Sequence, residues 1–352
     1  MQKSRNSGKT AIFSLTRKGA KLAARLSEHM PGSKCFCNHR YSLPSMISFR
    51  KISEVFPSVW RECDSIICIM SCGIAVRTIS PLLEDKFADP AVVVLDQDGR
   101  FAVSLVSGHI GGANELARKV ASITGGQAVI TTASDLQDKP AIDLAAKRAA
   151  LRIENRRMLA RIEAAILDEE PPWIFDPGGF LLEKLPAAHG LRIVSSGSDL
   201  KALRGVPGVW VSDTLPPRGL NCLKLRPATL VIGIGCNRGT SSEEIVAFVE
   251  KILEEYRLAP LSIRNFTSLD IKSDERGLLE AAKAFGRPVD FCAREQIEGL
   301  AVPNPSDTVA RHVGVKSVCE ASALWSAGTR QLLVPKRKAG NCTLAIARVG
   351  SP

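Results

Sequence analysis

The feature of this sequence that most constrains its fold is a regular alternation of short apolar runs with amphipathic stretches. The apolar runs have the length of single strands, and the stretches between them repeat apolar residues at helical spacing. The strands predicted in the first part of the chain are Thr10–Leu15, Ser65–Met70, Ala91–Leu95, Phe101–Leu105 and Gln127–Ile130. The helices predicted between them are Lys18–Glu28, Ile74–Leu83 and Gly112–Ile123. This alternation predicts an α/β domain with a largely parallel sheet.

The same alternation restarts after Pro227. An apolar run that ends in glycines, ATLVIGIG, leads into an amphipathic helix. Two overlapping capping boxes, Thr240 with Glu243 and Ser241 with Glu244, mark the start of that helix. The predicted strands that follow are Ser262–Phe266, Pro288–Phe291, Gln331–Val334 and Thr343–Val349, and the predicted helices are Asp274–Phe285 and Ser317–Ser326.

The segment between these two regions has a different character. It contains a basic helical stretch from Asp143 to about Leu167 and then the Pro/Gly-rich run PPWIFDPGGF. We therefore predict two α/β domains with largely parallel sheets that flank a small, less regular middle domain. The predicted boundaries are residues 1–138, 139–226 and 227–352.

Composition narrows the class of protein. No stretch approaches the roughly 18 consecutive apolar residues of a membrane-spanning helix, and the basic N-terminus lacks the apolar core of a secretory signal. We therefore expect a cytoplasmic protein that does not associate with a membrane. Ten cysteines are present, but none forms a C-x-x-C pair. In a long chain with ample core, this favours free thiols, with no disulfide framework and no metal site.

The net charge of +11 predicts an anionic partner, and both a nucleic acid and a small polycarboxylate fit that charge. The basic residues of the middle segment are compatible with nucleic acid or with a solvated helix face. Aromatic residues make up only 5% of the chain and none lies among these arginines, so base stacking is not favoured and we expect no nucleic-acid partner. The basic residues concerned are Lys147, Arg148, Arg152, Arg156, Arg157 and Arg161.

Candidate site residues in the first domain follow the ends of predicted strands, where ligands bind in open α/β sheets. Ser71 and Gly73 open a helix whose free N–H groups can hold a carboxylate, and Arg77 lies one turn further on. His109 follows another strand and is a candidate general base or acid, or else a structural residue in a turn. Glu115 and Asp135 are candidates for orienting it or transferring a proton. The remaining candidates for substrate binding here are Ser107, Gly108, Gly111, Gly112, Asn114 and Thr132.

The last domain offers a similar set of candidates. A glycine loop enters a capped helix, hydroxyl and charged residues follow the next strand, and a helix rich in small residues begins at Ser317. The loop has the spacing G-x-G-x-x-x-G, and no acidic residue ends the next strand, so a nicotinamide site is not favoured. The substrate-binding candidates are Gly233, Gly235, Cys236, Arg238, Thr267, Asp270, Lys272, Glu320 and Lys336. Asp270, Lys272 or Glu320 is equally a candidate for performing the chemistry itself.

These motifs together resemble the CbiG family. The segment SCGIAVRTISPLLEDKFADPAVVVLD…GRFAVSLVSGHIGGANELA…VITTASD is similar to its N-terminal domain. The segment VIGIGCNRGT…TSLDIKSDERGLLEAA…SVCEASAL…LLVPKRKAGNCTLAIARV is similar to its C-terminal domain, which also occurs alone as the protein CobE. The resemblance covers most of the chain, but the first forty residues and the middle segment match no family motif.

The resemblance implies an enzyme of anaerobic cobalamin biosynthesis that acts on cobalt-precorrin-5A. Such an enzyme opens the substrate's δ-lactone and releases a two-carbon fragment as acetaldehyde, which gives cobalt-precorrin-5B. The cobalt belongs to the substrate, so no cofactor of the protein itself is expected. The alternative is a non-catalytic carrier of tetrapyrrole intermediates. Neighbouring pathway enzymes are possible partners, and the oligomeric state stays open.

Overall fold

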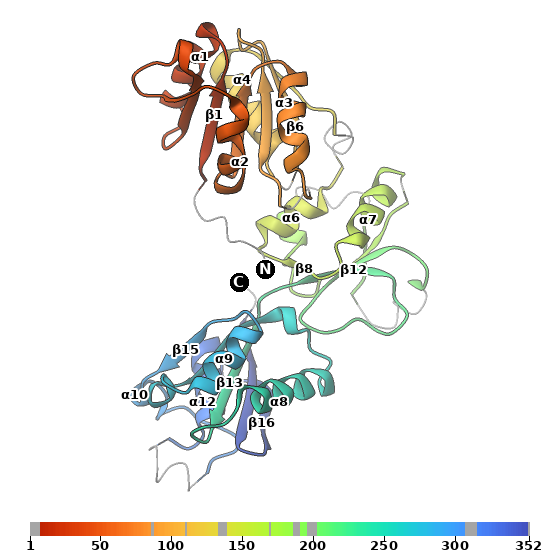
Figure 1. Cartoon of the computed structure of the whole chain (residues 1–352). Coiled ribbons are helices and arrows are strands. Elements are labelled where there is room, and N and C mark those ends of the chain that lie inside the picture. Colours follow the sequence, from red (N-terminus) through yellow and green to blue (C-terminus); the bar gives the residue numbers. More distant parts are fainter. Residues whose placement is uncertain are drawn as a thin grey trace. The chain divides into compact units, whose positions relative to one another are not determined.

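A computed structural model of the chain describes residues 8–85, 88–109, 111–132, 139–168, 170–185, 191–195, 203–306 and 315–350. The chain divides into two compact units, Met1–Leu144 and Ala145–Pro352. Each unit is built from strands that alternate with helices (Figure 1). None of the helices in the described ranges is both long enough and apolar enough to cross a membrane.

The first unit contains one mixed sheet with the order β3-β2-β1-β4-β5-β6-β7. Neighbouring strands are parallel except for β5 and β6, which are antiparallel. Two of these strands, β2 and β3, were missed by the sequence reading, which assigned no motif to the first forty residues. The strands are β1 (Thr10–Ser14), β2 (Lys34–Asn38), β3 (Ile47–Phe49), β4 (Ser65–Ile69), β5 (Ala91–Leu95), β6 (Phe101–Val106) and β7 (Gln127–Val129).

Helices cover both faces of this sheet. Alternate side chains of β1 and β4 point to opposite faces, so that Ile12 and Ile67 join one buried cluster and Phe13 and Cys68 join the other. The first cluster lies beneath α1 (Arg17–Glu28) and α4 (Ala113–Thr124). The second lies beneath α2 (Ile52–Glu62) and α3 (Cys72–Ile79). The unit is therefore a three-layered, doubly wound domain, and the predicted α/β class with a largely parallel sheet is confirmed.

The second unit contains two further sheets. The middle sheet has the order β10-β9-β11-β12-β8, in which only the β12–β8 pair is antiparallel. The prediction of one helix from Asp143 to Leu167 was wrong, because Ala150 adopts a positive φ of 51° and ends the first helix. The elements are α6 (Ile142–Arg148), β8 (Arg152–Ile153), α7 (Arg157–Leu167), β9 (Trp173–Phe175), β10 (Arg192–Ile193), β11 (Gly208–Val211) and β12 (Cys222–Arg226).

The last sheet has the order β15-β14-β13-β17-β16, with β13, β14 and β15 parallel and β17 antiparallel to both of its neighbours. Its strands are β13 (Leu230–Cys236), β14 (Ile263–Leu269), β15 (Val289–Cys292), β16 (Leu332–Ala339) and β17 (Cys342–Arg348). Its helices are α8 (Ser242–Glu255), α9 (Arg276–Ala284), α10 (Arg294–Ile297) and α12 (Val318–Ala327). Ser241 caps α8 by accepting a hydrogen bond from the Glu244 N–H at 3.2 Å, as one of the two capping boxes predicted.

The middle and last sheets are joined through a buried carboxylate. Asp213 follows β11 and is 6% exposed. It accepts two hydrogen bonds from Arg348, at 2.7 and 2.9 Å, and one from the Thr229 hydroxyl at 2.7 Å. Its backbone carbonyl accepts from the Ala259 N–H. One residue of the middle sheet therefore contacts three separate segments of the last domain.

All ten cysteines are free thiols, as the sequence predicted, and only Cys72 is fully exposed. Burial raises the pKa of Cys68 to about 12 and that of Cys222 to about 11, so these thiols are poor nucleophiles. Within the described ranges, no group of three or more His, Cys, Asp or Glu residues is arranged to hold a metal ion.

The packing of α12 on β13 gives a test of the fold. A Cβ added at Gly233 would lie 1.9 Å from the Cys319 carbonyl oxygen, which no side-chain rotation can relieve. We predict that Gly233→Ala lowers the free energy of unfolding by about 3 kcal/mol, measured by urea denaturation. Gly299→Ala is the control, because nothing lies within 4 Å of its added Cβ. Equal stability of the two variants would contradict the packing described.

Candidate functional site

The candidate base His109 lies on a tight loop between β6 and α4. Ser107 adopts a left-handed φ of 59°, which is costly for a residue with a side chain and is typical of functional loops. Its carbonyl accepts from the Ala113 N–H, and the Gly108 carbonyl accepts from the Asn114 N–H, so that the loop closes onto the start of α4. His109 is half-buried in this loop.

Two glycines allow the loop to close this tightly. A Cβ at Gly111 would lie 2.2 Å from the Ser107 Cβ, and Gly112 has a φ of 89°. The Gly112 N–H donates to the His109 carbonyl at 3.0 Å, whereas no hydrogen bond among the described residues uses the Gly111 N–H, which is therefore the candidate oxyanion donor.

Asn114 holds the loop in place through its buried side chain. It is 3% exposed, its Oδ1 accepts from the Ser104 hydroxyl at 2.6 Å, and its Nδ2 donates to the Thr132 hydroxyl at 3.2 Å. A Cβ at Gly108 would lie 2.9 Å from the same Asn114 Oδ1, so only glycine fits there. The structure therefore brings together the candidates on this loop and Thr132, and the Asn114 side chain contacts both.

The two proposed partners of His109 are placed differently. Glu115 is exposed in the first turn of α4, where a carboxylate also complements the helix dipole. Asp135 lies outside the described residues.

The ends of the strands form two opposite edges of the sheet, and Ser71 and Gly73 lie at the other such edge from His109. Because β6 runs antiparallel to β5, its carboxyl end adjoins the start of β5, whereas Ser71 follows the carboxyl end of β4. At that edge, between β1 and β4, the strand order reverses and a crevice of about 480 Å³ opens. Ser71, Cys72 and Thr16 line this crevice. The candidates of the first unit therefore form two groups at opposite edges of one sheet.

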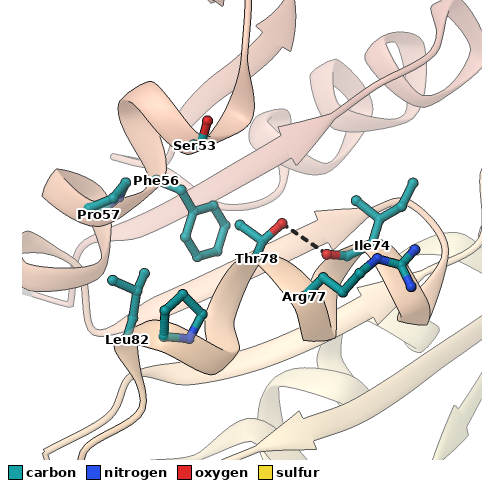
Figure 2. Close-up of a pocket in the computed structure, with 8 residues that line it drawn as sticks. Ser53, Phe56, Pro57, Ile74, Arg77, Thr78 and Leu82 are labelled. Atoms are coloured by element: carbon teal, nitrogen blue, oxygen red, sulfur yellow. Dashed lines mark hydrogen bonds between the residues drawn. The ribbon is translucent and has the colours of Figure 1, made fainter.

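Arg77 borders a separate pocket between α2 and α3, with a volume of about 330 Å³ (Figure 2). The walls are mostly apolar and include Phe56, Pro57 and Leu82. The Arg77 guanidinium folds back toward the start of α3, 3.6 Å from the position of a Cβ on Gly73. This keeps its charge near the free N–H groups of the helix start, as an anion clamp requires.

In the last domain, three candidates meet at the carboxyl ends of β13 and β14. Gly235 and Cys236 end β13, and the half-buried Lys272 follows β14. Between them lies Glu275, a residue that the sequence reading left out of the site. Its carboxylate, 5% exposed, accepts from the Gly239 N–H at 2.8 Å and from Lys272 at 3.3 Å. The Gly239 N–H lowers the pKa of Glu275, burial opposes this, and Lys272 lowers it further.

The exposed candidates at this edge have different surroundings. Arg238 forms a two-pronged ion pair with Asp274, at 3.0 and 3.1 Å, with both side chains more than 60% exposed. Asp270 is exposed, and among the described contacts its carboxylate accepts a hydrogen bond only from the neighbouring Ile271 N–H. An exposed ion pair contributes little to stability, so Arg238 can exchange its partner for a ligand carboxylate at low cost.

The other candidates of this domain are enclosed by the fold. Gly233 and Thr267 are buried, and Gly233 packs directly on the Cys319 carbonyl of α12. Glu320 is fully buried, and its carboxylate accepts from the backbone N–H groups of Asn304 at 3.0 Å and Lys336 at 2.9 Å. Asn304, which the sequence reading did not single out, also donates through Nδ2 at 2.8 Å. Glu320 thus connects a loop to β16.

Two family models match the chain. The model described as Cobalamin synthesis G N-terminal matches residues 54–135, and the model described as Cobalamin synthesis G C-terminus matches residues 230–347. A protein of Priestia megaterium named cobalt-precorrin-5A hydrolase is 32% identical over 97% of this chain and 95% of its own length. The chain belongs to the CbiG family. This confirms the family predicted from the two sets of motifs.

Two further relatives agree with this membership. A CbiG-family relative of Salmonella typhimurium, also named cobalt-precorrin-5A hydrolase, is 33% identical over 92% of this chain and 93% of its own length. Protein CobE of Sinorhizobium sp is 37% identical over 34% of this chain and 80% of its own length. Residues 136–229, which contain the middle sheet, lie between the two segments that the CbiG family models match.

The role of Glu275 can be tested by its pH dependence. We predict that Glu275→Gln lowers the free energy of unfolding by about 2 kcal/mol at pH 7, because a charge-assisted hydrogen bond is lost and Lys272 stays without its partner. The folded pKa of Glu275 is lowered, so its stabilisation is complete above the ordinary glutamate pKa of about 4.3 and is lost as the pH falls below it. In denaturation curves measured at both pH values, the stability difference between the wild type and Glu275→Gln should therefore be smaller at pH 4 than at pH 7.

Glu280→Gln is the matched control. Glu280 pairs with Arg276 at 2.8 Å, but the two side chains are 48% and 88% exposed. Its replacement should change stability by less than about 0.5 kcal/mol. A gap between wild type and Glu275→Gln that stays constant with pH would contradict the role given to the carboxylate.

Proposed function

We propose that this chain is a cobalt-precorrin-5A hydrolase that opens the δ-lactone of its substrate and releases acetaldehyde. The observation that carries the proposal is the near full-length match to two relatives of that name, at 32% and 33% identity. The net charge of +11 supports it, because the substrate bears acetate and propionate side chains.

The reaction requires water, a base and an acid. Water attacks the lactone carbonyl carbon, and the acyl C–O bond breaks to give a carboxylate and a hydroxyl group. Removal of the hydroxyl proton then lets the adjacent carbon–carbon bond break. The two-carbon fragment leaves as acetaldehyde, and the electron pair of the broken bond stays with the macrocycle. One water is consumed and no oxidant or reductant is needed.

His109 is the proposed base for the attacking water. Histidine suits this role because its imidazole changes protonation state near neutral pH. The strained Ser107 turn and the Asn114 hydrogen bonds support this proposal, because they restrain the backbone of the loop that carries His109. The Gly111 N–H is the proposed donor to the tetrahedral oxyanion, and Glu115 is the proposed proton carrier.

A carrier protein that binds the same intermediate without chemistry is the second candidate. A separate protein named CobE matches 34% of this chain, so a part of the chain can exist without the rest, and this favours a carrier role for that part. A carrier binds the substrate but releases no acetaldehyde from it, whereas a hydrolase does both.

We predict that His109→Ala lowers the rate of acetaldehyde release from cobalt-precorrin-5A by about a hundred-fold or more. Substrate binding should change little, because the imidazole acts on water. His39→Ala is the control, since His39 is exposed on a turn after β2 and should leave the rate unchanged. Acetaldehyde is measured by coupled reduction with alcohol dehydrogenase, and binding by the change in the corrinoid absorption spectrum.

Equal rates in wild type and His109→Ala would remove His109 from the mechanism and leave the exposed Asp270 as the next candidate. Binding without any release of acetaldehyde by the wild type would favour the carrier.

A further inference from the structure

The middle sheet has the topology of a small nucleotide-binding-type domain, although its sequence carries no family motif. Its parallel strands lie in the order β10-β9-β11-β12. The chain passes from β9 to β10 on one side and then crosses to β11 on the other side of β9. In open α/β sheets, ligands bind at such a reversal point, outside the carboxyl ends of the two strands concerned.

A cleft of about 540 Å³ opens at this reversal point. Phe175 and Gly178, at and after the end of β9, form one wall, and Val211 and Ser212, at and after the end of β11, form another. The last domain supplies the opposite wall through Gln331, beside the start of β16, together with the end of β17. The volume lies within the range of small-molecule sites.

The wall that follows β9 is rigid. Asp176 is 8% exposed and accepts hydrogen bonds from the backbone N–H groups of Phe180, Leu181 and Leu182 at 3.1, 2.8 and 3.0 Å. Burial raises the pKa of Asp176, and the three donors partly oppose this. A Cβ at Gly178 would lie 2.2 Å from the Phe180 ring, so only glycine allows this turn. The end of the Pro/Gly-rich run, residues 176–180, thus forms a pre-organised loop beside the cleft.

The lining combines flat aromatic surface with one cation. Phe175 stacks on Trp210 with ring centroids 4.2 Å apart and an interplanar angle of 16°. Arg348 stands at the opposite wall with its side chain 44% exposed, held by the buried Asp213. Because Asp213 fixes two of its nitrogens, the guanidinium is oriented before a ligand arrives.

We propose that this cleft binds one edge of a tetrapyrrole, with a peripheral carboxylate at Arg348 and the ring edge against Phe175. The ligand class rests on the proposed function, whereas the position of the cleft rests on the sheet topology and its lining. The cleft is smaller than a whole macrocycle, so it holds an edge and leaves the remainder outside.

The first test changes charge at the cleft without changing the core. Gln331 is exposed and lines the cleft, and Gln331→Glu places a like charge beside the proposed carboxylate site. We predict that this variant binds cobyrinic acid, a cobalt corrinoid with free peripheral carboxylates, about ten-fold more weakly than the wild type, measured by equilibrium dialysis. Gln127→Glu is the matched control, an exposed glutamine on β7, and should bind as the wild type does.

Arg348 provides the second test. Arg348→Lys keeps the charge and should retain most of the affinity, whereas Arg348→Gln should lose at least about ten-fold. Circular dichroism melting monitors folding, because Arg348→Gln also leaves the buried Asp213 without its cation. Cobinamide, whose periphery carries amides in place of carboxylates, should bind the wild type more weakly than cobyrinic acid does.

The outcomes separate this inference from the proposed function. If the wild type does not bind cobyrinic acid, or if Gln331→Glu binds it as tightly as Gln127→Glu, the cleft is not a tetrapyrrole site. If these variants weaken binding while the wild type releases no acetaldehyde from cobalt-precorrin-5A, the cleft proposal stands and the hydrolase proposal fails. If the wild type and the Gln331 and Arg348 variants release acetaldehyde at equal rate and with equal KM, the hydrolase proposal stands and the cleft proposal fails.

Discussion

The turn between β5 and β6 decides where the candidate residues of the first unit lie. Asp96 holds this turn, accepting from the Asp98 N–H at 2.7 Å and the Phe101 N–H at 2.8 Å, while Gly99 takes a positive φ of 70°. The chain therefore returns antiparallel, and β7 then pairs parallel to β6. This carries His109 and Thr132 to one edge of the sheet and leaves Ser71 at the other.

The sequence predicted strands such as β1, β4 and β5 well because each is a continuous apolar run that is buried on both faces. It predicted only the start of β16, which is largely half-buried or exposed. It missed the direction of β6, although Asp98-Gly99 between two apolar runs is a strong hairpin signal. It missed the middle sheet for a different reason. Strands such as Arg152–Ile153 and Arg192–Ile193 are too short to show any periodicity, and their pairing depends on partners far along the chain.

The candidate site was predictable only as local motifs. Gly233 and Gly235 both lie in β13 and not in the loop predicted there, and the added Cβ of Gly233 would meet the Cys319 backbone and that of Gly235 the Thr343 hydroxyl. Neither neighbour could be inferred from spacing. Glu275 likewise reaches Gly239 across 36 residues, so its role depends on the pairing of β13 with β14.

Burial of the carboxylates narrows the choice of catalytic group in the last domain. Glu320 is saturated by backbone N–H groups, and Glu275 is held by Gly239 and Lys272. The Gly239 N–H lowers the pKa of Glu275, so this carboxylate resists taking up a proton. Among the acidic candidates named in this domain, only Asp270 is exposed to a substrate. The base proposed in the first unit, His109, therefore has one exposed acidic alternative in the last domain, Asp270.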